Sequence, residues 1–227
     1  MELVINANDN KLLKEEVNKY IHLLYSQRDL PKKNELIAIT KLIILSKTVV
    51  NHLQPNHYRN SFIFDILSVM HSLTGNSIRQ FNFMLRSLIE NYHRSMLNLE
   101  DADQTGVNEL FKRSEEKFQT GPKEKAILDF IYGEYGKCCM VVHSNIKART
   151  NIQLFYADII KNDDFTKKNL TSTIDRVYNI LKSMVELFIS TKPLILENAF
   201  YRRKQQLRYL LNFNMYKQFS ENVKKLT

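Results

Sequence analysis

Only 5 glycines and 4 prolines occur among the 227 residues, and this scarcity is the feature that most constrains the fold. A protein made of many short strands needs frequent tight turns, and glycine and proline supply most of them. Hydrophobic residues make up 44% of the chain and charged residues 25%, which is ordinary for a globular protein. The composition therefore favours a few long helices joined by short loops.

Apolar residues recur at helical spacing along most of the chain, and capping residues and prolines mark the helix ends. Asn8 and Asp9 are expected to cap the first helix, and Ser172 with Asp175 to form a capping box at the eighth. We expect helices at about 10–28, 35–53, 58–73, 77–99, 107–118, 123–143, 152–160, 172–190 and 195–225. With no repeat and no linker, the sequence predicts one all-α helical-bundle domain over residues 1–227, with about seven to nine helices.

One helix carries an unusual polar stripe. On a wheel of about 100° per residue, four polar residues of the helix 77–99 fall within about 40° of Arg86: Arg79, Asn82, Glu90 and His93. The stripe lies between a broad apolar arc and Phe83, so we expect part of it to be shielded from water. Buried charges need partners, and Arg86 and Glu90 are four residues apart, which allows them to pair along the helix.

Two interpretations of this stripe remain open. An arginine beside a carboxylate and an imidazole could hold a phosphate and move a proton, which makes Arg86, Glu90 and His93 candidate catalytic residues. Arginine–glutamate pairs at this spacing are also common structural features of helices. In that case the stripe is a brace within the protein.

A second histidine lies near the end of the helix 123–143. Four residues share one face of this helix: Tyr132, Gly136, Cys139 and His143. Two glycines three apart, Gly133 and Gly136, suggest that a neighbouring helix approaches closely, because glycine otherwise costs about 1 kcal/mol in a helix interior. We expect His143 to meet Arg86 or Glu90, which makes it a fourth candidate catalytic residue. The alternative is a core or capping histidine.

Other classes of site find little support. Cys138 and Cys139 are adjacent, so a disulfide between them would be strained, and a reducing compartment is the simpler expectation. The sequence has no zinc-ligand spacing and no glycine-rich phosphate loop, so we predict no metal and no cofactor. The N-terminus does not resemble a signal peptide, and Lys41 and Lys47 interrupt the most apolar stretch. We therefore expect a cytoplasmic protein that does not associate with membranes.

The segments "RSLIENYHR" and "EYGKCCMVVHS" together resemble HEPN-like all-helical bacterial proteins. The resemblance covers residues 86–144, about a quarter of the chain. HEPN ribonucleases carry an arginine, four to six residues and then a histidine, and Arg86 and His93 have six residues between them. Ser87 stands where the family often has Asn, Asp or His, and Cys139 stands where its later pattern has serine.

The resemblance implies metal-independent cleavage of RNA, in a toxin or phage-defence setting. A histidine would remove the proton of a ribose 2′-hydroxyl and Arg86 would stabilise the charge on phosphorus, with paired sites formed across a homodimer. The alternative that the residues leave open is a non-catalytic helical module. Such a module would bind a protein or nucleic-acid partner, and its Arg–Glu–His cluster would be structural.

Positive charge is concentrated at the C-terminus. Residues 201–227 carry a net charge of +6 out of +9 for the whole chain. We predict one basic helix at about 195–225, in which Arg202, Arg203, Lys204 and Arg208 are candidate contacts to nucleic-acid phosphates, with aromatic side chains nearby for stacking. An amphipathic core helix with a basic polar face is the alternative, because Leu207 and Leu210 fall at core positions.

Overall fold

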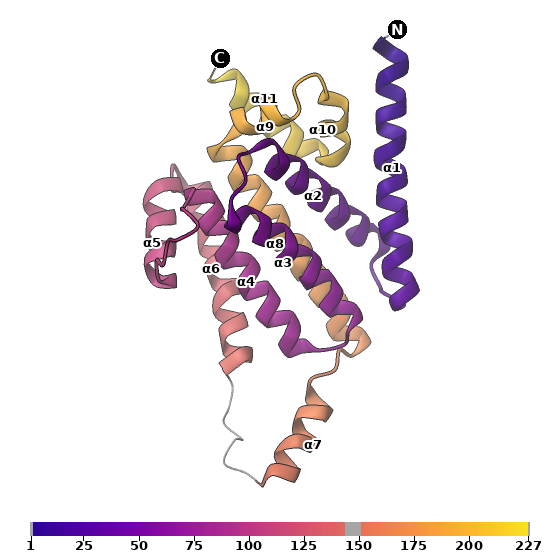
Figure 1. The fold of residues 1–227 in the computed structure, drawn as a ribbon, viewed down its shortest axis with the longest axis vertical. Coiled ribbons are helices and arrows are strands. Elements are labelled where there is room, and N and C mark those ends of the chain that lie inside the picture. The colour runs from indigo at the N-terminus through magenta and orange to yellow at the C-terminus, as the bar shows by residue number, and fades with distance from the viewer. Residues whose placement is uncertain (1, 144–150, 227) are drawn as a thin grey trace.

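The computed structural model describes residues 2–143 and 151–226, and for residues 2–9 the backbone alone. Within these ranges the protein has eleven helices and no strand, which confirms the all-α prediction but exceeds the seven to nine helices expected (Figure 1). The helices are α1 (Glu2–Gln27), α2 (Lys33–His52), α3 (His57–Thr74), α4 (Ile78–Leu97), α5 (Val107–Phe118), α6 (Pro122–His143), α7 (Ile152–Asn162), α8 (Lys167–Thr191), α9 (Pro193–Ala199), α10 (Lys204–Leu210) and α11 (Phe213–Lys224).

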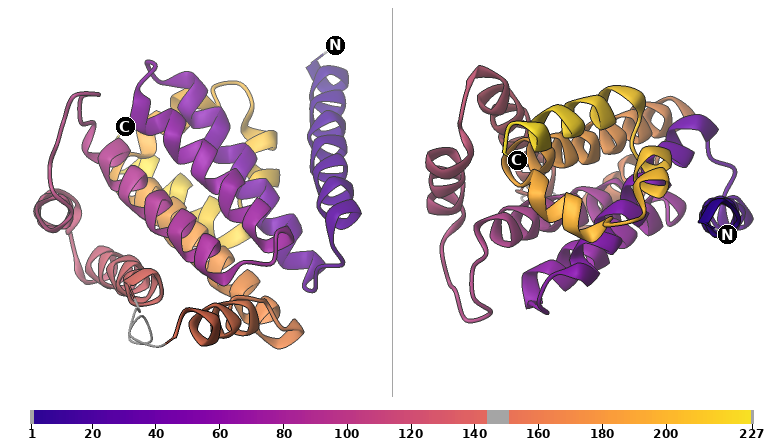
Figure 2. Two further views of the ribbon diagram at one scale, coloured as in Figure 1. Left: turned by 60° about the horizontal axis from the view of Figure 1, so that its bottom comes forward. Right: turned by 90° about the horizontal axis from the view of Figure 1, so that it is seen from above.

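Helix α4 organises the bundle. It packs against α3, α5 and α6, while α8 packs against α2, α6 and α11. Figure 2 shows α9, α10 and α11 covering one end of the bundle, and α1 standing at its side, where it contacts α2 and α10. The core is aliphatic, with fully buried side chains from several helices that include Leu36, Ile66, Leu85, Ile131 and Leu187. Burial of this apolar surface is the main force that holds the helices together.

Local capping chemistry explains where the central helices begin. The side chain of Asn56 accepts a hydrogen bond from the backbone N–H of Arg59 at the start of α3, and that of Ser77 accepts one from Gln80 at the start of α4. Each such bond satisfies a backbone donor that would otherwise have no partner. At the other end of α4, Asn98 adopts a left-handed conformation with φ of 60°, which terminates the helix.

Two predicted helix starts are wrong. Helix α8 begins at Lys167, because Thr166 accepts from the N–H of Asn169, so Ser172 lies inside the helix. Helix α1 begins at Glu2, and Asn8 and Asp9 lie within it. No glycine or proline interrupts residues 2–9, so nothing in the backbone stops the helix there.

The single basic helix predicted at 195–225 is also wrong, because three short helices occupy this segment. The chain turns between α9 and α10, where Arg202 has a left-handed backbone with φ of 60°. It turns again after α10, where Leu211 is extended and Asn212 caps α11 by accepting from the N–H of Met215. These breaks let Leu207, Leu210 and other apolar residues fold back onto the bundle.

Helix α7 differs from the others because none of its described residues is buried. It is joined to α4 by Asp163, whose carboxylate accepts from the Ser77 hydroxyl and from the backbone N–H of Arg79, both at 2.7 Å. Ile152, Leu154 and Tyr156 are exposed on α7. None of the described helices combines the length and the apolar character that crossing a lipid bilayer requires.

Candidate functional site

The polar stripe of α4 faces three different neighbours. Asn82 is 3% exposed and His93 is fully buried, so the expected shielding of the stripe from water is confirmed. Asn82 meets α8, Arg86 and Glu90 meet α6, and His93 meets α5. The stripe is therefore divided into separate clusters, although its members share one face of a single helix.

One of these clusters lies at the protein surface. We call it the Arg86 cluster, and it consists of Arg86, Glu90, Tyr135 and His143. The Arg86 Nε–H lies 3.0 Å from both the Glu90 carboxylate and the Tyr135 hydroxyl oxygen, and it donates to the two together. The Tyr135 hydroxyl in turn donates to the same Glu90 oxygen at 2.8 Å. Arg86 Nη1 lies 3.1 Å from His143 Nε2. The pairing of Arg86 with Glu90 and the approach of His143 are both as the sequence predicted.

The electrostatics of the cluster keep Arg86 charged and Tyr135 protonated. Burial alone would lower the pKa of Arg86, but hydrogen bonds to Glu90 and Tyr135 outweigh that effect and raise it. Burial raises the pKa of Tyr135, and its hydrogen bond to Glu90 raises it further. Since Arg86 has no acceptor, its contact with His143 requires that Nε2 of the imidazole carries a lone pair, with the proton on Nδ1. The cluster thus presents a neutral imidazole beside a fixed cation.

His143 is the exposed member of this cluster. It is the last residue of α6, while Tyr135 lies two turns earlier on the same helix and anchors that helix to α4. Arg79 lies nearby, because its guanidinium donates to the backbone carbonyl of Val142 at 3.1 Å. A reagent in solution can therefore reach the imidazole and the positive charge around it.

Comparison of the chain with protein-family models, curated proteins and solved structures found no match. The HEPN-like resemblance therefore has no support beyond the residues that suggested it.

His93 lies apart from the Arg86 cluster. Its Nδ1 is 2.9 Å from the Ser114 hydroxyl of α5, and its ring packs edge-on against Phe111 with 4.7 Å between centroids. Its Nε2 is buried without a hydrogen-bond partner among the described residues. Burial lowers the pKa of His93 to about 3, so the ring is neutral at physiological pH. No hydrogen bond links His93 to Glu90 among the described residues, and a fully enclosed imidazole cannot reach a substrate, so we omit His93 from the site proposed below.

A second polar cluster lies where α4, α6 and α8 meet. Arg176 of α8 forms an ion pair with Glu134 and donates to the side-chain oxygen of Asn82 at 3.0 Å. It also donates to the sulfur of Cys138 at 3.3 Å. Burial raises the pKa of Cys138 to about 11, so this thiol stays protonated. Both Cys138 and Cys139 are free thiols.

The close helix approach expected at Gly133 and Gly136 is absent. A methyl group added at either position would have no described atom within 4 Å, and both glycines are exposed. Tyr132 is also exposed and packs on Phe111 at 4.9 Å between centroids.

The basic C-terminal residues lie far from the Arg86 cluster. Figure 1 places α9 to α11 at one end of the molecule and the end of α6 at the other. Arg203 donates to the carbonyl of Ala199, and Lys204 pairs with Glu197, so both cations have partners within the C-terminal segment itself. Arg202 and Arg208 are exposed. The leucines of α10 are core residues, as the alternative interpretation of this segment proposed.

Two residues of these clusters were not singled out from the sequence. These are Tyr135 and Arg176. The available signal was a tyrosine two turns before His143 and, for Arg176, an arginine placed between the core residues Ile174 and Val177 of α8. Within the described ranges, no group of three or more His, Cys, Asp or Glu side chains is arranged to hold a metal ion.

Proposed function

We propose that this protein is an RNA-directed protein that cleaves phosphodiester bonds without a metal ion, with Arg86 and His143 as its catalytic residues. The observation that carries the proposal is the 3.1 Å contact between Arg86 Nη1 and His143 Nε2 at an exposed position. It pairs a fixed positive charge with a neutral base, which is the combination needed to attack RNA through its own 2′-hydroxyl.

In this proposal Arg86 Nη1 leaves His143 Nε2 and turns to the phosphate when RNA binds, which frees the Nε2 lone pair to accept the proton of the ribose 2′-hydroxyl. The resulting oxygen attacks the adjacent phosphorus. The bond to the 5′-oxygen breaks, and that oxygen takes a proton from the solvent. The products are a 2′,3′-cyclic phosphate and a 5′-hydroxyl. Arg86 stabilises the extra negative charge on the phosphate oxygens, since described partners are found for only two of its five N–H donors. Glu90 and Tyr135 are positioning residues that hold the guanidinium.

The surrounding charge supports an anionic substrate. Arg79 lies beside Val142, and the side chain of Lys137, one and a half turns before His143, is 61% exposed. Arg79 adds positive potential at the end of α6 where His143 lies, whereas Lys137 is paired with Glu134 at 2.6 Å. Such potential attracts the phosphate backbone regardless of sequence.

The test is cleavage of a labelled single-stranded RNA in the presence of EDTA, followed by analysis of the new ends. We expect 2′,3′-cyclic phosphate ends, and a loss of rate of about 100-fold for each of His143→Ala and Arg86→Gln. His93→Phe should retain the activity, because that ring is enclosed in the core.

Arg113→Gln is a matched control for the loss of one arginine, because Arg113 forms an exposed pair with Glu109 on α5. Cleavage that persists unchanged in His143→Ala would contradict the assignment. So would an RNA-cleaving activity that EDTA abolishes.

The resemblance also implies a homodimer, and the proposal therefore includes a second copy of the chain. The exposed apolar residues of α7, among them Ile152, Leu154 and Tyr156, are the surface on which it would form, since this helix follows His143 in the chain. Light scattering coupled to size exclusion should give twice the mass of 26.9 kDa, and Leu154→Glu should halve it. A monomeric wild-type protein would rule out this part of the proposal.

A non-catalytic module remains the second candidate, and one observation favours it. Arg86, Glu90 and Tyr135 satisfy one another's hydrogen bonds and join α4 to α6, which is what a structural brace does. Under this alternative no RNA is cleaved. Arg86→Gln would then lower the free energy of unfolding while leaving partner binding at other surfaces intact.

A further inference from the structure

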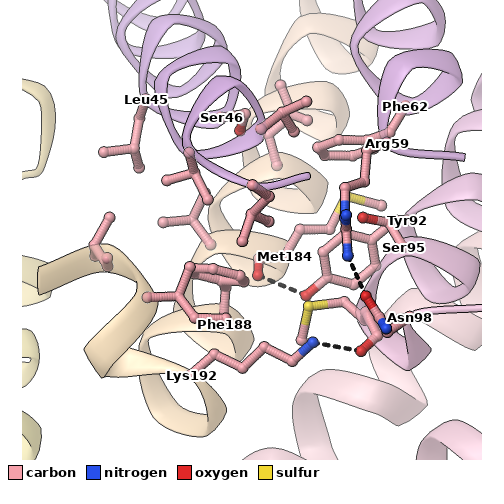
Figure 3. A pocket seen from close by; sticks show the side chains of 18 residues that line it. Leu45, Ser46, Arg59, Phe62, Tyr92, Ser95, Asn98, Met184, Phe188 and Lys192 are labelled. Atoms are coloured by element: carbon pink, nitrogen blue, oxygen red, sulfur yellow. Dashed lines mark hydrogen bonds between the residues drawn. The ribbon is translucent and has the colours of Figure 1, made fainter. Parts of the chain in front are cut away.

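The helices of the bundle form a partly open cavity of about 260 Å³ that has no part in the Arg86 cluster. It lies between α2, α3, α4, α8 and α9, and most of its wall is aliphatic or aromatic (Figure 3). The wall includes Leu45, Val49, Phe62, Met184, Val185 and Phe188. Protein interiors are normally packed without voids of this size, and apolar cavities readily accept apolar ligands.

The two cationic side chains of the cavity lie on one side of it. Figure 3 shows Arg59, Asn98 and Lys192 together, opposite Leu45 and Ser46. Arg59 donates to the side-chain oxygen of Asn98, and Lys192 Nζ donates to the backbone carbonyl of Met96 at 2.5 Å. The residues that line the cavity include two cations and no aspartate or glutamate. The cavity is therefore amphipathic, with a positively charged side.

These two cations are incompletely paired. Arg59 Nη1 donates to the carbonyl of Gln54, but its Nε is buried with no partner in the described part of the chain. For Lys192 a single acceptor is found there, the Met96 carbonyl. Burial, with the nearby charges of Lys117 and Arg59, lowers the pKa of Lys192 to about 8. An anion between Arg59 and Lys192 would satisfy donors that the protein itself leaves open.

We propose that this cavity binds a single-chain aliphatic carboxylate, with its head group between Arg59 and Lys192 and its chain against Val49 and Phe188. A cavity of about 150 Å³ holds the six carbons of benzene. By proportion, the 260 Å³ here suits a chain of about ten carbons. The single positively charged side selects one anionic head, and the apolar wall selects an unbranched or weakly branched chain.

Decanoate tests the proposal, with decanol and decyltrimethylammonium as ligands of the same chain length but a different head. Isothermal titration below the micellar range should give saturable 1:1 binding of decanoate. Decanol should bind about tenfold more weakly, because it lacks the charge-assisted hydrogen bonds, and the cationic analogue should not bind. Acetate should not bind either, because it has no chain to bury. Absence of saturable decanoate binding, or equal binding of all three ten-carbon ligands, would overturn the proposal.

Substitutions of residues that line the cavity test whether decanoate binds there. Lys192→Met and Arg59→Met should each weaken decanoate about tenfold and leave decanol unchanged. Ser46→Phe places a ring in the apolar side and should abolish binding of both. Lys161→Met on α7 is the matched control and should change neither. Using both charge variants keeps the test decisive if one fails to fold. Decanoate binding that survives both charge variants and Ser46→Phe would place the ligand elsewhere and refute the assignment.

Discussion

Replacing Arg176 with methionine should lower the free energy of unfolding by about 3 kcal/mol, because it removes one of the two cations that pair with the buried carboxylate of Glu134. The Glu134 side chain is 5% exposed, and Arg176 pairs with it while also donating to its backbone carbonyl at 3.2 Å. Burial alone would raise the pKa of Glu134, but hydrogen bonds to Lys137 and Arg176 outweigh burial and lower it. Lys137 remains paired with Glu134 in the variant. We therefore expect the decrease in the free energy of unfolding to lie near the lower end of the range known for broken buried pairs.

Urea unfolding at neutral pH measures this effect. The double variant Glu134→Met with Arg176→Met should recover much of the loss, since replacing both members of a buried pair by apolar side chains is often close to neutral. Arg113→Met is the control, because its pair with Glu109 is exposed and should contribute less than about 0.5 kcal/mol. If Arg176→Met and Arg113→Met lost the same stability, the pair of Arg176 with Glu134 would contribute no more than an exposed pair.

His93 should make the protein lose stability steeply in mild acid. Burial lowers the pKa of His93 to about 3 in the folded state, whereas the unfolded chain has the ordinary value of about 6.5. Between these values the unfolded state binds a proton that the folded state does not, so the stability present above pH 6.5 falls as the pH is lowered. The slope is about 1.4 kcal/mol per pH unit, which amounts to roughly 3 kcal/mol at pH 4.5.

The His93→Phe variant isolates this contribution from those of the other histidines. It keeps an aromatic ring against Phe111 but cannot titrate, and it loses the hydrogen bond to Ser114 at a cost of about 1 kcal/mol. We therefore expect the variant to be less stable than the wild type at pH 7.5 and more stable at pH 4.5. Chemical unfolding at the two pH values measures the reversal. Parallel stability profiles for the two proteins would show that His93 does not titrate as its burial indicates.

Helix positions were the most predictable part of the fold. The helix predicted at 107–118 is reproduced by α5, and those predicted at 77–99 and 123–143 are close to α4 and α6. These helices have caps and breaks that act through their own backbone, so a short window contains the information. The segment 195–225 was less predictable, because its breaks depend on apolar residues folding back onto distant helices.

The candidate site was predictable only in part. The i, i+4 relation between Arg86 and Glu90 is local, and the ion pair follows from it. The sequence could suggest that His143 approaches Arg86, but it could not give the position of His143, because that position depends on the packing of α6 against α4. His93 shares the stripe yet faces α5, and no feature of the stripe distinguishes the part that α5 covers from the part that α6 covers.

The sequence by itself determined the helical class, the main helices and the polar stripe of α4, because each follows from spacing and capping within a few turns of chain. The tertiary structure alone decided that Arg79 is exposed, that His93 is buried and that Asn82 accepts a hydrogen bond from Arg176. It also decided that two cations share one side of an apolar cavity. The physical reason is that burial and charge pairing depend on which helices come together, and that depends on the packing of the whole core.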